Sequence, residues 1–247
     1  MNRLSFNKVS GFTLIELISV IVILGILAVG VSSFLKFGTQ IYAEATARDQ
    51  IISSARFSVE RLNREVRHAL PNSLVTYVNS SGFSCLKFTP IIASSTYIDL
   101  PVLPEPSSST LAIIPFNDDD FAQAAKVIVY PLAIADLTDI SDNNHMFSSL
   151  DKSTEPWILN FVSPIHFESD SPSQRVYFIS DNVDYCLAGT NLMRNGILMA
   201  QNITNNAPFQ VASASLRRNA LVQVHLQFEK NFEKVTFNNE VQVLNVP

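Results

Sequence analysis

The feature that most constrains this chain is an uninterrupted apolar run at residues 17–35. None of its 19 positions is charged, and 14 of them belong to the hydrophobic class. As a helix rising 1.5 Å per residue, the run would be about 28 Å long, which is close to the hydrocarbon thickness of a bilayer. The sequence therefore predicts one membrane-spanning helix near the N-terminus.

The residues ahead of this run predict its orientation. Residues 1–11 contain Arg3 and Lys8 and no acidic residue. Positive charge marks the cytoplasmic flank of a span, so we expect the remainder of the chain to lie on the opposite side of the membrane. A secretory signal has a shorter apolar region and a small-residue cleavage site after it, and neither is evident here.

One acidic residue, Glu16, stands at the start of the apolar run. A carboxylate in that position costs a few kcal/mol unless it has a partner, so it is by default a candidate functional residue. The alternative is a solvated carboxylate at the membrane interface.

Residues 10–16 read SGFTLIE and lead directly into the apolar run. This order resembles the prepilin signature of type IV pilins and of the pseudopilins of type II secretion. The resemblance implies that a membrane peptidase cleaves between Gly11 and Phe12, that the new N-terminus on Phe12 is methylated, and that Glu16 acts in assembly.

The same resemblance implies partners and a location. The partners would be other major and minor pilins through the N-terminal helix, the prepilin peptidase, the inner-membrane assembly platform, and membrane lipid before assembly. The chain would begin as a single-pass protein of the bacterial inner membrane, with a cytoplasmic N-terminus and a periplasmic head. It would then enter a pilus fibre at the cell surface.

The helical period continues beyond the apolar run. Apolar residues recur every three or four positions and form one stripe, typical of an amphipathic helix that packs on other structure: Phe37, Ile41, Ala45, Ile52, Ala55, Val59, Leu62, Val66 and Ala69. We assign Glu65 to the opposite, solvent-facing side, and we expect Glu60 and Arg64 to pair at i,i+4. Pro71 provides the stop, so one helix is expected from about residue 12 to about residue 69.

Residues 71–247 have the character of a β-rich region. Runs of β-forming residues recur at 74–78, 126–130, 157–162, 175–180, 183–187, 220–228 and 240–246. Pro- and Ser-rich stretches at 101–110 and 169–173 are expected to be loops. We predict an α+β fold in which a long N-terminal helix packs on an antiparallel sheet. The organisation would be a leader at 1–11, a transmembrane and assembly segment at 12–35, an amphipathic segment at 36–70 and a globular head at 71–247.

The chain has two cysteines, Cys85 and Cys186, 101 positions apart. On the predicted extracytoplasmic side, which is oxidising, we expect them to form one disulfide. The chain-entropy account of such a loop gives about 4–5 kcal/mol of stabilisation. Two free buried thiols are the alternative.

We expect neither enzymatic activity nor a cofactor. The sequence has no G-x-S-x-G, P-loop, H-E-x-x-H or dinucleotide glycine motif, and its four histidines are scattered. Asp118, Asp119 and Asp120 are weak candidates for calcium ligands, but their spacing is not that of an EF-hand, and a solvated acidic loop is the stronger alternative. With 17 basic against 22 acidic residues, a nucleic-acid partner is not expected.

Four later stretches resemble those of particular subunits. The arginine-rich segment at 61–73 resembles that of J-type pseudopilins, which cap or prime a fibre. Sequences at 186–190, 216–222 and 240–247 resemble minor pilins of the mannose-sensitive haemagglutinin (MSHA) pilus. A secretion pseudopilin and a membrane-anchored adhesin or lectin head remain alternatives.

Overall fold

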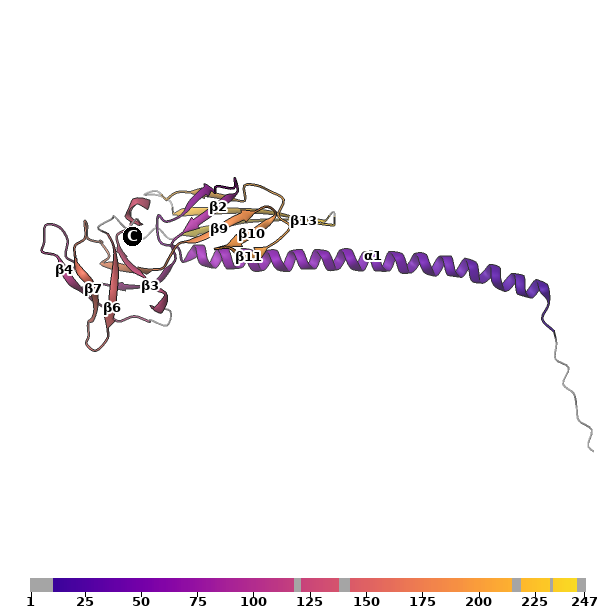
Figure 1. The fold of residues 1–247 in the computed structure, drawn as a ribbon, viewed down its shortest axis with the longest axis horizontal. Helices are drawn as coiled ribbons and strands as arrows, with labels where there is room; N and C mark the ends of the chain where they lie inside the picture. Colours follow the sequence, from indigo (N-terminus) through magenta and orange to yellow (C-terminus); the bar gives the residue numbers. More distant parts are fainter. Residues whose placement is uncertain (1–10, 118–120, 138–142, 215–218, 232, 244–247) are drawn as a thin grey trace, which may run out of the picture. The chain divides into compact units, whose positions relative to one another are not determined.

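The structure of the chain is a computed structural model that describes residues 11–117, 121–137, 143–214, 219–231 and 233–243. Figure 1 shows one long helix, α1, and a head built from β-strands. The predicted α+β architecture, with an N-terminal helix followed by antiparallel sheets, is confirmed. The chain divides into two compact units, and the boundary lies within α1, between Asp49 and Gln50.

α1 (Leu14–Arg67) is 54 residues long, within two residues of the prediction at either end. Its last turn tightens, because the N–H groups of His68 and Ala69 donate to the carbonyl oxygens three residues earlier. Pro71 then prevents the helix from continuing.

In the second unit, one face of α1 is buried against two sheets. Ala55, Leu62 and Val66 are fully buried, as the predicted stripe requires, and they belong to a core shared with both sheets. Ser58 is also buried there, and its hydroxyl donates to the Met199 carbonyl at 2.7 Å. This part of α1 is therefore held by apolar packing and by a polar tie to one strand.

The first sheet in this core is antiparallel and has five strands in the order β1-β2-β9-β10-β11. The strands are β1 (Val75–Val78), β2 (Ser84–Phe88), β9 (Val183–Ala188), β10 (Asn191–Arg194) and β11 (Ile197–Ala200). Because β2 and β9 are neighbours, the residues between them must leave the sheet and return.

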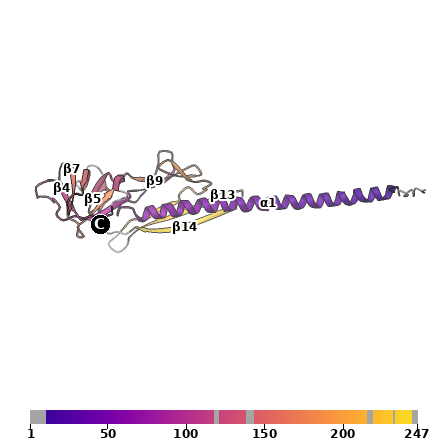
Figure 2. The ribbon, with the colours of Figure 1, turned by 90° about the horizontal axis from the view of Figure 1, so that it is seen from below.

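The second sheet has three antiparallel strands, β12 (Phe209–Ala212), β13 (Ala220–Lys230) and β14 (Glu233–Val243). In β13 the predicted alternation is confirmed: Val222, Val224 and Leu226 are buried, whereas the residues between them are exposed. Figure 2 shows β13 and β14 running beside the C-terminal part of α1, where the side chains of Asn239 and Asn63 are hydrogen-bonded.

The residues between β2 and β9 form a separate six-stranded antiparallel sheet in the order β3-β8-β5-β6-β7-β4. Its strands are β3 (Ile91–Thr96), β4 (Ser108–Ile113), β5 (Lys126–Val129), β6 (Asn144–Asp151), β7 (Trp157–Ile165) and β8 (Arg175–Ile179), with short 3-10 helices η1 (Phe121–Gln123) and η2 (Ile134–Leu137). This sheet closes on itself. Beyond the end of β3, Ile98 donates to the Ala112 carbonyl at 3.0 Å, and Ile114 donates to the Thr96 carbonyl at 2.9 Å. We call residues 91–179 the barrel.

The barrel has its own core, distinct from the one around α1. Phe178 is fully buried, and its ring lies 5.1 Å from that of Phe116 and 5.0 Å from that of Phe121. A closed sheet leaves no edge strands to pair with other chains, and the packed aromatic side chains fill its interior.

A small third cluster joins the barrel to the rest of the head. Leu70 packs with Ile128, Tyr177 and Ile179 of the barrel. Main-chain hydrogen bonds reinforce it, from Leu70 to the Thr89 carbonyl and from Ile91 to the His68 carbonyl, both at 2.8 Å. The barrel is therefore an insertion that is anchored at its two ends next to the C-terminus of α1.

The predicted strands are all present, with one shifted boundary. β14 (233–243) begins before the predicted strand at 240–246, of which residues 244–246 lie outside the described residues. The predicted loop at 101–110 is wrong at its end, because β4 already begins at Ser108. The strands that sequence patterning did not identify, among them β10 and β11, are mostly short and lack a clear alternation of polar and apolar residues.

Candidate functional site

The first candidate site is the start of α1. Gly11, Phe12 and Thr13 precede the helix, and the N–H groups of Glu16 and Leu17 donate to the Thr13 carbonyl at 3.1 and 3.3 Å. Thr13 is thus the N-cap residue of α1.

This geometry places Glu16 at the third helical position, three residues after the cap. Threonine followed three residues later by glutamate is the spacing of a capping box, and a carboxylate in the first turn interacts favourably with the helix dipole. Glu16 is exposed in the isolated chain. Its side chain is therefore placed to act locally, as part of this capping box.

The helix that follows exposes apolar side chains on every side. Residues 14–46 are all exposed, and their large apolar side chains include Ile15 at 72%, Val29 at 69% and Phe34 at 76%. In the described part of the chain, α1 is long and apolar enough to cross a membrane. Such a surface requires lipid or other apolar helices around it.

The apolar stripe predicted beyond the span is buried only in its second half. Phe37 and Ile41 are about two-thirds exposed, at 66% and 65%, whereas the buried positions of α1 begin with Ala47 and Ile51. The first half of the stripe is therefore open to contacts with other molecules.

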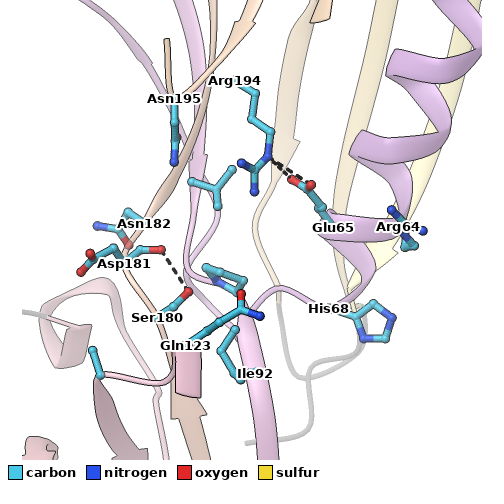
Figure 3. A pocket seen from close by; sticks show the side chains of 13 residues that line it. Arg64, Glu65, His68, Ile92, Gln123, Ser180, Asp181, Asn182, Arg194 and Asn195 are labelled. Atoms are coloured by element: carbon cyan, nitrogen blue, oxygen red, sulfur yellow. Dashed lines mark hydrogen bonds and ion pairs between the residues drawn. The ribbon is translucent and has the colours of Figure 1, made fainter. Parts of the chain in front are cut away.

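A second candidate site lies at the C-terminal end of α1, around Glu65 (Figure 3). The Arg194 Nε atom is 2.8 Å from one carboxylate oxygen of Glu65, and the Tyr185 hydroxyl donates to the same oxygen at 2.9 Å. Arg61 donates to the other oxygen at 2.9 Å. The assignment of Glu65 to the solvent-facing side is therefore wrong, because its side chain connects α1 to β9 and β10.

The environment of Glu65 favours its ionised form. Burial by itself raises the pKa of Glu65, but the hydrogen bonds from Arg194, Arg61 and Tyr185 outweigh burial, so the pKa lies below its ordinary value of 4.5. Burial and the neighbouring Glu65 carboxylate raise the pKa of Tyr185 well above its ordinary value, so Tyr185 remains a neutral donor. The predicted pair of Glu60 with Arg64 is replaced by the pair of Arg61 with Glu65.

A cavity of about 510 Å³ lies beside this cluster, between α1, the start of the barrel and the segments around Asn182 and Asn195. Two of the polar side chains that line the cavity already form hydrogen bonds with neighbouring residues. The Asn195 side-chain oxygen accepts from the Asp184 N–H at 2.7 Å, and the Asn182 oxygen accepts from the Thr89 hydroxyl at 2.7 Å. These contacts hold the barrel connections in place.

The predicted disulfide is present: Cys85 and Cys186 are bonded, and they face each other in the register of β2 and β9. They flank the barrel insertion on both sides. The bond was expected from the oxidising compartment alone, and the pairing of β2 with β9 explains how the two cysteines meet.

The calcium candidates Asp118, Asp119 and Asp120 lie outside the described residues. Among the residues that are described, no group of three or more His, Cys, Asp or Glu side chains is placed to hold a metal ion. The carboxylate of Asp136 has a structural role, because it accepts from the N–H groups of Leu132 and Ala133 at 2.8 Å.

The N-terminal segment of the chain matches a known protein family. Residues 6–32 match the prokaryotic N-terminal methylation motif. A search of curated proteins and a search of solved structures return no match. The motif supports a subunit of the type IV pilin-like or pseudopilin kind, in agreement with the pilin-like architecture of the chain. Together, the motif and the apolar helix fit a single-pass membrane anchor.

Proposed function

We propose that this chain is a minor pilin, a structural subunit that is processed at its N-terminus and assembled into a type IV pilus of the MSHA kind. The observation that carries the proposal is the methylation motif at 6–32, which leads directly into an exposed apolar helix. Hydrolysis between Gly11 and Phe12 would release the basic leader and leave a new amine on Phe12. The span would remain attached to the head.

A physical argument supports a role for Glu16 in assembly. The amine on Phe12 is a cation at the start of an apolar helix, and Glu16 is an anion one turn further along. When helices stack in an apolar fibre core, the amine of one subunit and the Glu16 carboxylate of its neighbour neutralise each other. Neither charge has such a partner in an isolated chain surrounded by lipid.

The finer assignment rests on sequence resemblance. The stretches at 186–190, 216–222 and 240–247 resemble those of the MSHA minor pilin MshO, and we propose a position in the priming or tip complex. Residues 215–218 and 244–247 lie outside the described part of the chain. Gly189 has a structural reason to be glycine, because it adopts a φ of 62° at the turn between β9 and β10.

The proposed partners and location follow from the same resemblance to prepilins. The chain would contact other major and minor pilins through α1, and would meet the prepilin peptidase and the assembly platform in the inner membrane. Its head would be periplasmic before assembly and would lie at the cell surface afterwards. We propose a structural role without enzymatic activity or cofactor.

The test separates the charge of Glu16 from its position in the capping box. Glu16→Gln retains a residue suited to the box but loses the charge, whereas Glu16→Ala loses both. We expect both variants to be cleaved after Gly11 and to be strongly depleted from sheared surface fibres. Mass spectrometry of the membrane and sheared fractions measures cleavage and incorporation separately.

The matched control is Glu44→Gln, which removes an exposed carboxylate of α1 beyond the apolar run. This variant should enter fibres normally. Normal incorporation of Glu16→Gln would show that the charge is dispensable, and a chain that is never cleaved after Gly11 would contradict the proposal as a whole.

Two alternatives predict different results in the same cells. A J-type pseudopilin would co-purify with components of a secretion system rather than with pilus subunits. An adhesin or lectin head is suggested by the barrel, which is an insertion with its own core. Binding of the full-length chain to a glycan array would support that alternative.

A further inference from the structure

The outer face of α1 in the second unit is basic and uncovered. Arg56, Phe57, Glu60, Arg64 and Arg67 are all exposed, and their spacing of three or four residues places them along one side of the helix. We call these five residues the basic face. In the described part of the chain, its three arginines form no ion pair.

The composition of this face is that of a binding surface. Phe57 is 59% exposed although it lies in a helix whose opposite side is a packed core. Arginine and aromatic side chains are enriched at protein–protein interfaces, so a phenylalanine among three exposed arginines fits such a surface.

Charge is distributed unevenly between the barrel and the rest of the head. The barrel, residues 91–179, has 12 acidic and 3 basic residues, a net charge of −9. The remaining residues of the second unit have 7 acidic and 10 basic residues, a net charge of +3. The barrel and the rest of the second unit thus have net charges of opposite sign.

The described acidic residues of the barrel include a pair in a groove of about 570 Å³. Asp99 and Glu105 line this groove together with the hydroxyl-bearing residues Ser108 and Thr110. Phe167, which precedes the exposed Glu168, donates its N–H at 2.8 Å to the carbonyl of Pro101, a residue that lines the groove. Carboxylates and hydroxyls in a groove are suitable acceptors for guanidinium groups.

We propose that the basic face of one copy of this chain binds the acidic groove on the barrel of a second copy. The inference rests on the proposed fibre function and adds a specific contact between heads. Two basic faces repel each other, and two acidic barrels repel each other. Opposite charge therefore favours pairing of the basic face of one copy with the barrel of the other. Such a contact is heterologous, because the two copies contribute different surfaces.

The experiment uses the full-length chain in its own cells, with Phe57→p-benzoylphenylalanine as a photo-cross-linker. After irradiation, we expect a cross-linked dimer in the fibre fraction. Mass spectrometry should identify the attachment site within residues 97–110 of the second copy. Attachment to another kind of subunit or to lipid would overturn the proposal.

Charge reversal tests whether the two surfaces recognise each other. Arg64→Glu with Arg67→Glu should lower the yield of cross-linked dimer about tenfold, because attraction is replaced by repulsion across two exposed pairs. Asp99→Lys with Glu105→Lys should have the same effect. Chains that carry all four substitutions should recover the dimer. Failure to recover it, with both double variants present in fibres, would overturn the proposal.

The matched control is Glu240→Lys, which reverses an exposed acidic residue on β14 outside the barrel. This variant should leave the dimer yield unchanged, and an equal loss would mean that net charge rather than the groove is responsible. The sheared fraction separates the two proposals. If the cleaved chain is in fibres without the dimer, this inference fails and the proposed function stands; if the chain is absent from fibres, the proposed function fails.

Discussion

Cys85 and Cys186 lie directly opposite each other on β2 and β9, and their disulfide closes the chain at the base of the barrel insertion. All of residues 91–179 lie between the two cysteines. The bond therefore keeps β2 and β9 paired even when the barrel opens.

Removing this bond should destabilise the head. We expect Cys85→Ala with Cys186→Ala to lower the free energy of unfolding by about 2–5 kcal/mol, because the unfolded chain gains the freedom of a long loop. Chemical denaturation followed by circular dichroism measures the loss. The same loss should appear in the wild-type chain after reduction, and an unchanged denaturation midpoint in both samples would contradict the prediction.

The Glu65 cluster should make the stability of the head depend on acidic pH. Because the pKa of Glu65 is lower in the folded chain than its ordinary value of 4.5, ionised Glu65 stabilises the fold above about pH 4.5. That contribution is lost as the pH falls through the folded-state pKa. Glu65→Gln should cost about 1.5–3 kcal/mol at neutral pH, because it removes charge-assisted hydrogen bonds. Denaturation at a series of pH values should show a smaller decrease at acidic pH for this variant.

Glu60→Gln is the matched control, since Glu60 is exposed on the same helix and has no ion pair among the described residues. It should retain the pH dependence of the wild-type chain. Equal behaviour of the two variants would show that the bonds to Arg194 and Tyr185 contribute nothing.

The two cores should contribute independently to stability. Leu62→Ala opens the core around α1 and should cost about 2–5 kcal/mol, and Phe178→Ala opens the barrel core and should cost about 3–5 kcal/mol. Because the two residues belong to different clusters, the double variant should lose close to the sum of the two costs.

The only tryptophan of the chain, Trp157, lies on β7 of the barrel, with its ring 5.4 Å from that of Phe116. Its fluorescence reports barrel unfolding, while circular dichroism reports the whole head. Phe57→Ala, at an exposed position of the same helix as Leu62, is the control and should change stability little. A strongly non-additive double variant would mean that the cores are coupled.

Several elements could be predicted because their signals are local. The span and the amphipathic helix follow from hydrophobic content and a period of three to four residues, and Pro71 marks the end. β13 follows from strict alternation around Gln223, His225 and Gln227. The long helix followed by β-rich sequence was sufficient for the fold class.

The position of Glu65 could not be predicted in this way. On a helical wheel it borders the apolar stripe next to Leu62 and Val66, where a charged residue is ordinarily solvated. Its partners Tyr185 and Arg194 are 120 and 129 positions away along the sequence. A single sequence has no signal for contacts at that separation. The cluster of Glu65 with Tyr185 and Arg194 therefore becomes visible only in the folded structure, where β9 and β10 pack beside α1.

The sequence by itself therefore determined the apolar segment long enough to span a membrane, the long helix and the α+β class, because each depends on the order of neighbouring residues. Only the tertiary structure decided that residues 91–179 close into a barrel, that the cysteines flank it, and that the head has two cores. Those features depend on pairings between distant strands, such as the closure of β3 against β4, and strand pairing is set by packing of the whole fold rather than by local propensity.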